Sequence, residues 1–237
     1  MNILKYCKTQ WILKKKWILS LWPVNQSDNF LRYVILCHPR TGSTWLHTLL
    51  NSNVHIQSYG ELLTERSDTQ HLEKEIWTSH HESIQAVGCK IFYEQLIHPD
   101  FGMLLNEIAS DSSVRIIDLT RENFVDRMIS LKTAEATGRW SSNKTTSPRP
   151  SNLTIDKEEI DLTVDKSIND RRAVLSRLKD HSIFPVTYEQ ICSETDSRLT
   201  QIQEFLQVPP KRLFSLLKKQ SVNTQIDVQV KEMSHKK

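Results

Sequence analysis

The sequence has 237 residues, of which 38% are hydrophobic and 25% charged, a composition typical of a globular chain and not of a disordered one. Its formal net charge of +3 is too small to indicate nucleic-acid binding, although a modest positive bias helps an enzyme that holds a multiply charged anion. This length suits one α/β domain large enough to bury a full sheet.

Cysteine and histidine usage gives no sign of a metal site. The cysteines at 7, 37, 89 and 192 have no metal-ligand spacing and form no disulfide framework. A reducing compartment is therefore favoured, and a cytoplasmic location is expected. The nine histidines form no ligand pattern, so no metal is expected. No apolar run approaches the roughly 20 residues that a membrane-spanning helix needs.

The first 27 residues are basic and rich in tryptophan. No acidic residue precedes Asp28, and the segment holds lysines at 5, 8, 14, 15 and 16 and tryptophans at 11, 17 and 22. Such a composition suggests contact with a membrane surface, but on a helical wheel the lysines do not separate from the tryptophans. We expect a loosely docked extension over 1–27, with a surface anchor as the alternative. A domain over 28–230 and a frayed tail over 231–237 complete the predicted organisation.

The most informative stretch begins with the apolar run Tyr33–Cys37, which predicts a buried strand. Gly42 marks a tight turn, and the two hydroxyl residues after it supply N-cap chemistry for an apolar helix over Ser43–Leu50. A strand, a turn and a helix N-terminus bring several backbone N–H groups together, so this unit predicts a site for a phosphate-like anion. Arg40 adds a cation beside it. An ordinary βα turn is the alternative interpretation, whereas a Walker A loop is excluded because its Gly-Lys-Ser/Thr ending is missing.

This turn resembles the 5′-phosphosulfate loop of sulfotransferases, in which an Arg/Lys-Ser/Thr-Gly-Ser/Thr-Thr-x-Leu pattern follows the first strand. The pattern is closest to the bacterial carbohydrate sulfotransferases of the nodulation-factor and trehalose type, and the resemblance covers roughly residues 33–225. It implies a single α/β domain with a central parallel sheet flanked by helices, in a P-loop-like arrangement. It also implies sulfuryl transfer from 3′-phosphoadenosine 5′-phosphosulfate (PAPS) to a hydroxyl of a carbohydrate or glycolipid acceptor. The donor-binding residues that it implies in the turn are Arg40, Thr41, Gly42, Ser43, Thr44 and Trp45, with Trp45 stacking on adenine.

The resemblance implies two further donor contacts. In this family an Arg at the end of a later strand and a Ser eight or nine residues on bind the donor 3′-phosphate, and here these are Arg121 and Ser130. The Arg supplies a charge-assisted contact and the Ser a hydroxyl. An exposed Arg and an ordinary helical Ser are the alternative. The tail residues Lys218 and Lys219 resemble a late basic segment that closes over the same phosphate.

Glu61 is the candidate general base. A Gly-Glu pair about twenty residues after the loop carries the base in the bacterial relatives, and Gly60-Glu61 stands at that place. We expect Gly60 to bend the chain before Glu61. A solvated glutamate on a loop is the alternative, and Arg40 is the second residue to which the resemblance gives a catalytic role.

The remaining pattern concerns the acceptor side and the scaffold. The polar residues 64–82 predict a surface insertion that borders the acceptor site. Residues 139–150 predict a lid over the acceptor, in which Trp140 either stacks on a sugar or anchors the loop to the domain. Residues 86–92 predict a strand whose Lys90 either reaches the acceptor or merely ends the strand. We further expect a helix over 153–180, a strand over 183–189 whose Tyr188-Glu189 pair is scaffold, and a helix over 198–208.

Two other function classes compete with this interpretation. A P-loop-like nucleotide kinase would need a lysine at the end of the loop and a magnesium-holding aspartate, for which Asp118 would have to serve. A non-catalytic, membrane-peripheral PAPS-binding protein would keep Arg121 and Ser130 but would not need Glu61.

Overall fold

A five-stranded parallel sheet forms the centre of the molecule, in the strand order β3-β5-β2-β6-β8. The computed structural model describes residues 11–16, 18, 25–61, 71–138, 140, 152–155, 157–217 and 227–229. The sheet strands are β2 (Leu31–Cys37), β3 (Ile56–Glu61), β5 (Ala86–Phe92), β6 (Arg115–Thr120) and β8 (Ile183–Thr187). The near-continuous apolar runs of the central strands β2 and β5 suit strands that are buried on both faces.

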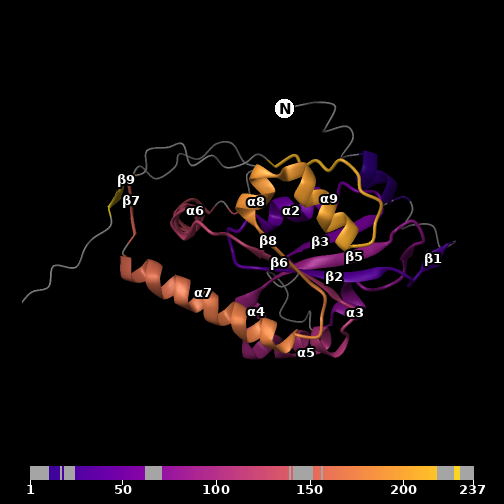
Figure 1. The fold of residues 1–237 in the computed structure, drawn as a ribbon, viewed down its shortest axis with the longest axis horizontal. Coiled ribbons are helices and arrows are strands. Elements are labelled where there is room, and N and C mark those ends of the chain that lie inside the picture. The colour runs from indigo at the N-terminus through magenta and orange to yellow at the C-terminus, as the bar shows by residue number, and fades with distance from the viewer. Residues whose placement is uncertain are drawn as a thin grey trace, which may run out of the picture.

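Both faces of the sheet are covered by helices (Figure 1). Along β2 the side chains alternate, so that Val34 and Leu36 enter one buried cluster while Tyr33 and Ile35 enter the other. The first cluster is closed by α3 (Leu72–Glu75), α4 (Tyr93–Ile97), α5 (Gly102–Ser110) and α7 (Lys157–Arg177). The second is closed by α2 (Ser43–Leu50), α8 (Tyr188–Ser193) and α9 (Thr195–Phe205). The predicted α/β domain with a helix-flanked parallel sheet is confirmed.

The order of the strands creates a topological switch point between β2 and β6. After β2 the chain crosses to β3 and β5 on one side, whereas after β6 it crosses to β8 on the other. The register pairs Cys37 with Leu119, so the loops that follow these two central strands leave the sheet at the same level. Ligands of open parallel sheets bind at such a switch point, beyond the carboxyl ends of the strands.

Smaller elements complete the fold. The short strand β1 (Gln26–Ser27) pairs antiparallel with β4 (His80–His81), and β7 (Asn152–Thr154) pairs parallel with β9 (Asp227–Gln229). The 3-10 turn η1 (Pro99–Phe101) joins α4 to α5, and α6 (Phe124–Thr137) follows β6. Figure 1 shows α7 as a long helix that extends away from the sheet toward β7.

The structure corrects the expectation of a surface insertion over 64–82 in its described part, residues 71–82. Leu72, Ile76 and Trp77 are buried in the first cluster, so this segment contributes to the core. These apolar residues are isolated among many polar ones, so the sequence shows no periodic pattern that would indicate their inward orientation.

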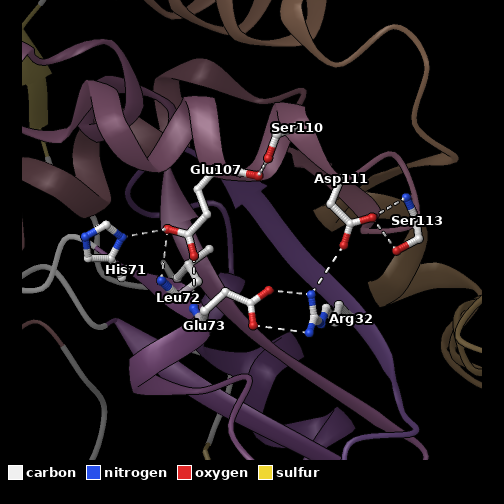
Figure 2. A network of polar contacts seen from close by, with 8 residues as sticks. All are labelled: Arg32, His71, Leu72, Glu73, Glu107, Ser110, Asp111 and Ser113. Carbon is white, nitrogen blue, oxygen red and sulfur yellow. Dashed lines mark hydrogen bonds and ion pairs between the residues drawn. The ribbon is translucent and has the colours of Figure 1, made fainter.

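Polar contacts hold this segment at the end of the sheet where β2 begins (Figure 2). Arg32, near the start of β2, pairs with Glu73 and with Asp111 at 3.4 Å. Glu107 accepts hydrogen bonds from the backbone N–H groups of Leu72 and Glu73 at 3.1 and 2.9 Å. The switch point between β2 and β6 lies at the opposite ends of the strands, so residues 71–82 do not border it.

Part of the N-terminal extension is docked on the domain. Residues 11–16 are helical, and Ile12 is only 3% exposed. Lys16 Nζ donates to the backbone oxygen and to Oδ1 of Asn51, at 2.8 and 2.9 Å, and also to the backbone oxygen of Ile56. The docking is therefore built on specific contacts, which is firmer than the loose docking expected. The tail over 231–237 lies outside the described residues.

Three predicted elements have wrong boundaries, and one of them is the helix predicted over 198–208, which spans Thr195–Phe205 as α9. The helix predicted over 153–180 begins only at Lys157, because residues 152–154 form β7. The strand predicted over 183–189 ends at Thr187, whose side chain accepts a hydrogen bond from the Gln190 N–H at 3.1 Å and so starts α8.

Candidate active site

The loop between β2 and α2 is shaped by two left-handed residues. Arg40 has φ 65° and Gly42 has φ 84°, and Gly42 itself is the N-cap of α2. The prediction that Ser43 and Thr44 cap this helix is wrong: both lie in its first turn, and no side chain caps it. The first N–H groups of a helix have no partner within it, so this uncapped end presents them beyond the carboxyl end of β2.

Tyr188 lies against this loop. A Cβ added at Gly42 would lie 2.5 Å from the Tyr188 ring, so only glycine fits there without displacement. The guanidinium of Arg121 stacks over the same ring at 4.8 Å from its centroid, and Trp45 meets it edge-on at 6.1 Å. Burial raises the pKa of Tyr188 to about 12, with Cys192 adding to the shift. The phenol thus remains neutral and serves as a platform.

Arg121 is held beside the loop, as its predicted role requires. Its Nη1 donates to the backbone oxygen of Arg40 at 3.2 Å. Asp126 and Glu189 lie at 3.5 and 3.9 Å from its guanidinium, and Glu189 also accepts from the Glu122 N–H at 3.0 Å. Arg121 Nε is buried and has no hydrogen-bond acceptor among the described residues.

The Arg40 side chain joins the two predicted halves of the donor site. Its Nε donates to Ser130 Oγ at 2.8 Å and its Nη1 to the backbone oxygen of Trp140 at 2.7 Å. Burial lowers the pKa of Arg40, and the nearby charge of Arg121 lowers it further. Two guanidinium groups side by side favour an anion between or beside them.

A second set of contacts connects the loop to Glu61. Lys90 is 5% exposed, and its Nζ lies 3.0 Å from Thr44 Oγ1 and 3.1 Å from Glu61 Oε2. Glu61 is the last residue of β3, and the pairing of β3 with β5 shifts register between Ser58 and Glu61. The bend expected at Gly60 is therefore a strand irregularity that brings Glu61 level with Lys90.

His47 lies on the α2 face that meets β3. Its Nδ1 is 2.9 Å from Ser58 Oγ. Burial lowers the pKa of His47 to about 4, with smaller contributions from the charges of Lys90 and Lys16. The imidazole is neutral at pH 7 and adds no charge beside Glu61.

The described end of the tail runs along α2. The Phe214 N–H donates to Ser52 Oγ at 3.0 Å, and Ser215 Oγ lies 2.6 Å from Thr48 Oγ1. The chain thus passes from the C-terminal end of α2 toward its N-terminal end. Lys218 and Lys219 lie outside the described residues.

A family comparison agrees with this geometry. The family model described as the sulfotransferase domain matches residues 32–237. The chain belongs to the sulfotransferase family. A curated relative, nodulation protein H of Rhizobium tropici, is 28% identical over 199 residues, which cover 76% of this chain and 77% of that protein. The resemblance inferred from the two motifs is confirmed, and the fold is the P-loop-like one of this family.

Membership in the sulfotransferase family excludes the kinase alternative, and the local contacts agree. Asp118, the only aspartate offered for magnesium, is 1% exposed. It accepts a hydrogen bond from Tyr93 at 2.6 Å and pairs through both oxygens with Arg171. No cluster of metal-ligating side chains occurs among the described residues.

The imidazole of His38, next to the loop, also has polar partners. Its two ring nitrogens lie 3.1 Å from Glu94 Oε2 and 3.0 Å from the backbone oxygen of Ser167. Both ring nitrogens are thus occupied by these contacts, so His38 is poorly placed to act as a base.

The sequence interpretation understated three residues of this sulfotransferase site. Tyr188 and Glu189 were assigned to the scaffold, yet they position Gly42 and Arg121, as described above. The sequence did not decide whether Lys90 reaches the acceptor or only ends its strand. Its contact with Glu61 depends on the pairing of β3 with β5, which the sequence does not show directly. The only sequence signal was that each of them lies at or near the end of a predicted strand.

Proposed function

We propose that this sulfotransferase transfers a sulfuryl group from PAPS to a hydroxyl of a carbohydrate or glycolipid acceptor. The observation that carries the proposal is the chain of contacts from Thr44 through Lys90 to Glu61, which connects the anion loop to a carboxylate. The acceptor class rests on the likeness of the loop to the bacterial carbohydrate enzymes and on the relative named nodulation protein H.

The donor would bind across the two halves of the site. The N–H groups of residues 41–45 at the start of α2 would hold the 5′-phosphosulfate, with the Ser43 and Thr44 hydroxyls beside them. Arg121 and Ser130 would hold the 3′-phosphate, and the buried Arg121 Nε offers a hydrogen bond that no described residue accepts. Arg40 lies close enough to serve either group, while Trp45 would stack on adenine. Lys218 and Lys219 are proposed to close over the 3′-phosphate.

The reaction would be an in-line displacement at sulfur. The Glu61 carboxylate would accept the proton of the acceptor hydroxyl while the acceptor oxygen bonds to sulfur and the bond from sulfur to the 5′-phosphate oxygen breaks. The products are a sulfate ester and 3′-phosphoadenosine 5′-phosphate. Lys90, within hydrogen-bond distance of both the loop and the base, would offset the charge that develops on the departing phosphate. Positioning and charge stabilisation thus supply the rate enhancement.

Replacing Glu61 by Gln tests the base. The amide keeps the size of the side chain but cannot accept a proton, so turnover should fall by about 10²–10⁴-fold. PAPS affinity should change little, because Glu61 contributes no attraction to an anionic donor. Turnover is measured as transfer of labelled sulfate, and Glu75→Gln, an exposed acid in α3 at the other end of the sheet, is the matched control.

The outcome separates two roles for Glu61, general base and positioning residue. A raised acceptor KM with turnover largely kept would assign a positioning role. Near wild-type turnover at saturating acceptor would overturn the base assignment.

The acceptor is best found by a PAPS-dependent screen of hydroxylated glycans and glycolipids with mass detection. A thermal-shift panel of 3′-phosphoadenosine 5′-phosphate, ATP and GTP precedes it, in which only the first should stabilise the protein strongly. A chain that binds this nucleotide but modifies no acceptor would instead support the non-catalytic binding protein.

A further inference from the structure

The docked N-terminal helix has an inner and an outer side. Ile12 and Lys16, four residues apart, point into the domain: Ile12 is 3% exposed and Lys16 is hydrogen-bonded to Asn51. Trp11 and Ile18, seven residues apart, are 59% and 48% exposed. Residues seven apart share one helical face, so these two apolar side chains lie together on the outside.

Two lysines accompany them. Lys14 and Lys15 are exposed, and at helical spacing they fall within the same arc as Trp11 and Ile18. Lys15 Nζ lies 5.4 Å from the centroid of the Trp11 ring. We call Trp11, Lys14, Lys15 and Ile18 the outer stripe.

The contacts of Lys16 fix the direction in which the outer stripe faces. Its ammonium binds the carbonyl and the side-chain oxygen of Asn51, the C-cap of α2, where helix carbonyls attract a cation. A third acceptor is the backbone oxygen of Ile56. Turning the helix to bury Trp11 would break all three contacts, so the outer stripe remains directed away from the domain.

We propose that the outer stripe docks the protein on the surface of an anionic lipid bilayer. An exposed tryptophan with an isoleucine beside it suits the apolar boundary below the headgroups, and neighbouring lysines suit anionic headgroups. The charge is complementary along the whole segment, since no acidic residue precedes Asp28. No helix among the described residues has the length and apolarity to cross a bilayer, so the contact is with the surface.

Vesicle co-sedimentation of the full chain tests this proposal. Vesicles made of about two thirds phosphatidylcholine and one third phosphatidylglycerol should bind the protein, and added salt should release it. Vesicles of phosphatidylcholine alone should bind it much more weakly. Lys14→Glu with Lys15→Glu should weaken binding at least about tenfold. Trp11→Ser should weaken it independently of salt, because it removes the apolar contact.

The matched control is Lys179→Glu with Lys211→Glu, which changes the net charge equally at exposed positions outside the N-terminal helix. This control should bind as the wild type does, and thermal unfolding of every variant should match the wild type. Absence of binding to anionic vesicles, or an equal loss in the control, would overturn the proposal. None of these measurements uses sulfuryl transfer, so their failure is distinct from failure of the proposed activity.

Discussion

Arg40 and Arg121 approach each other closely for two side chains of like charge. Burial and this proximity both lower the pKa of Arg40, while Asp126 and Glu189 compensate Arg121 only at 3.5 and 3.9 Å. A bound anion would relieve this repulsion, so the two cations are held in an arrangement that the proposed donor would stabilise.

Arg121→Ala should therefore weaken binding of 3′-phosphoadenosine 5′-phosphate much more than binding of adenosine 5′-phosphate. A charge-assisted contact to the 3′-phosphate is worth about 1.5–3 kcal/mol, which is roughly 10- to 150-fold in Kd. Isothermal titration calorimetry with both nucleotides measures the difference, and Arg172→Ala, exposed in α7, is the control. Equal losses for the two nucleotides would show that Arg121 does not bind the 3′-phosphate.

His47 predicts a pH dependence of stability. Burial lowers its pKa to about 4 in the folded protein, against the ordinary value of 6.5. Between these values the unfolded chain binds the proton and the folded protein does not, so stability falls as the pH is lowered from 6.5 to 4 and changes no further below 4. His47→Gln keeps a polar partner for Ser58 and should lessen the loss between pH 7 and 4.5 by on the order of 2 kcal/mol. Urea unfolding at both pH values checks this, and identical pH profiles would contradict it.

At the scale of elements, β2 and β5 approach each other closely at one glycine. Gly88 pairs with Tyr33, and a Cβ added to Gly88 would collide with the backbone oxygen and the ring of Tyr33. These two strands also carry the donor loop and Lys90, so the glycine sets the spacing on which the site depends.

Gly88→Ala should destabilise the protein by about 2–4 kcal/mol, because backbone atoms cannot yield as a flexible side chain would. Gly102→Ala is the matched control, since an added Cβ there meets nothing within 4 Å and α5 begins at this residue. That variant should change stability by less than about 1 kcal/mol, in the stabilising direction. Denaturant unfolding compares them, and equal midpoints would contradict the close approach of the two strands.

The elements that the sequence predicts well are those whose signal is local. The run Tyr33–Cys37 and the helix Ser43–Leu50 were predicted within two residues, because apolar periodicity and one turn glycine determine them. The strand over 86–92 was predicted correctly for the same reason.

The incorrect or incomplete predictions concern partners that are distant in the sequence. Trp77 looked like a surface aromatic because the cluster that buries it comes from other elements, and residues 152–154 pair with β9, whose strand lies more than seventy positions later. The ion pair of Lys90 with Glu61 follows from strand order, which no window of sequence contains.

At the scale of the whole molecule, the N-terminal extension is an addition to a complete sheet. Ile12 and Lys16 dock on it, but none of the five central strands comes from the first 27 residues. The family match likewise begins only at residue 32.

Removing residues 1–24, which leaves β1 intact, should give a folded protein with unchanged affinity for 3′-phosphoadenosine 5′-phosphate. Loss of the buried Ile12 and of the Lys16 contacts should cost about 2–3 kcal/mol, or roughly 4–12 °C in Tm. Differential scanning calorimetry and nucleotide titration measure the two quantities. A truncated chain that does not fold would show that the extension belongs to the core.

The parts of the proposed donor site meet through contacts between residues that are distant in the sequence. Arg40 meets Arg121, Ser130 and Trp140 across 81, 90 and 100 positions of the sequence, and Lys90 meets Thr44 across 46. Closing loops of this length costs conformational entropy before the contact at the end of the loop contributes any stabilisation. Such contacts therefore form late in folding. Nucleotide affinity should therefore appear only after β2, β5 and β6 have paired. On the ribosome these contacts cannot form before the chain beyond α6 has been synthesised, so we expect partly made chains not to bind 3′-phosphoadenosine 5′-phosphate.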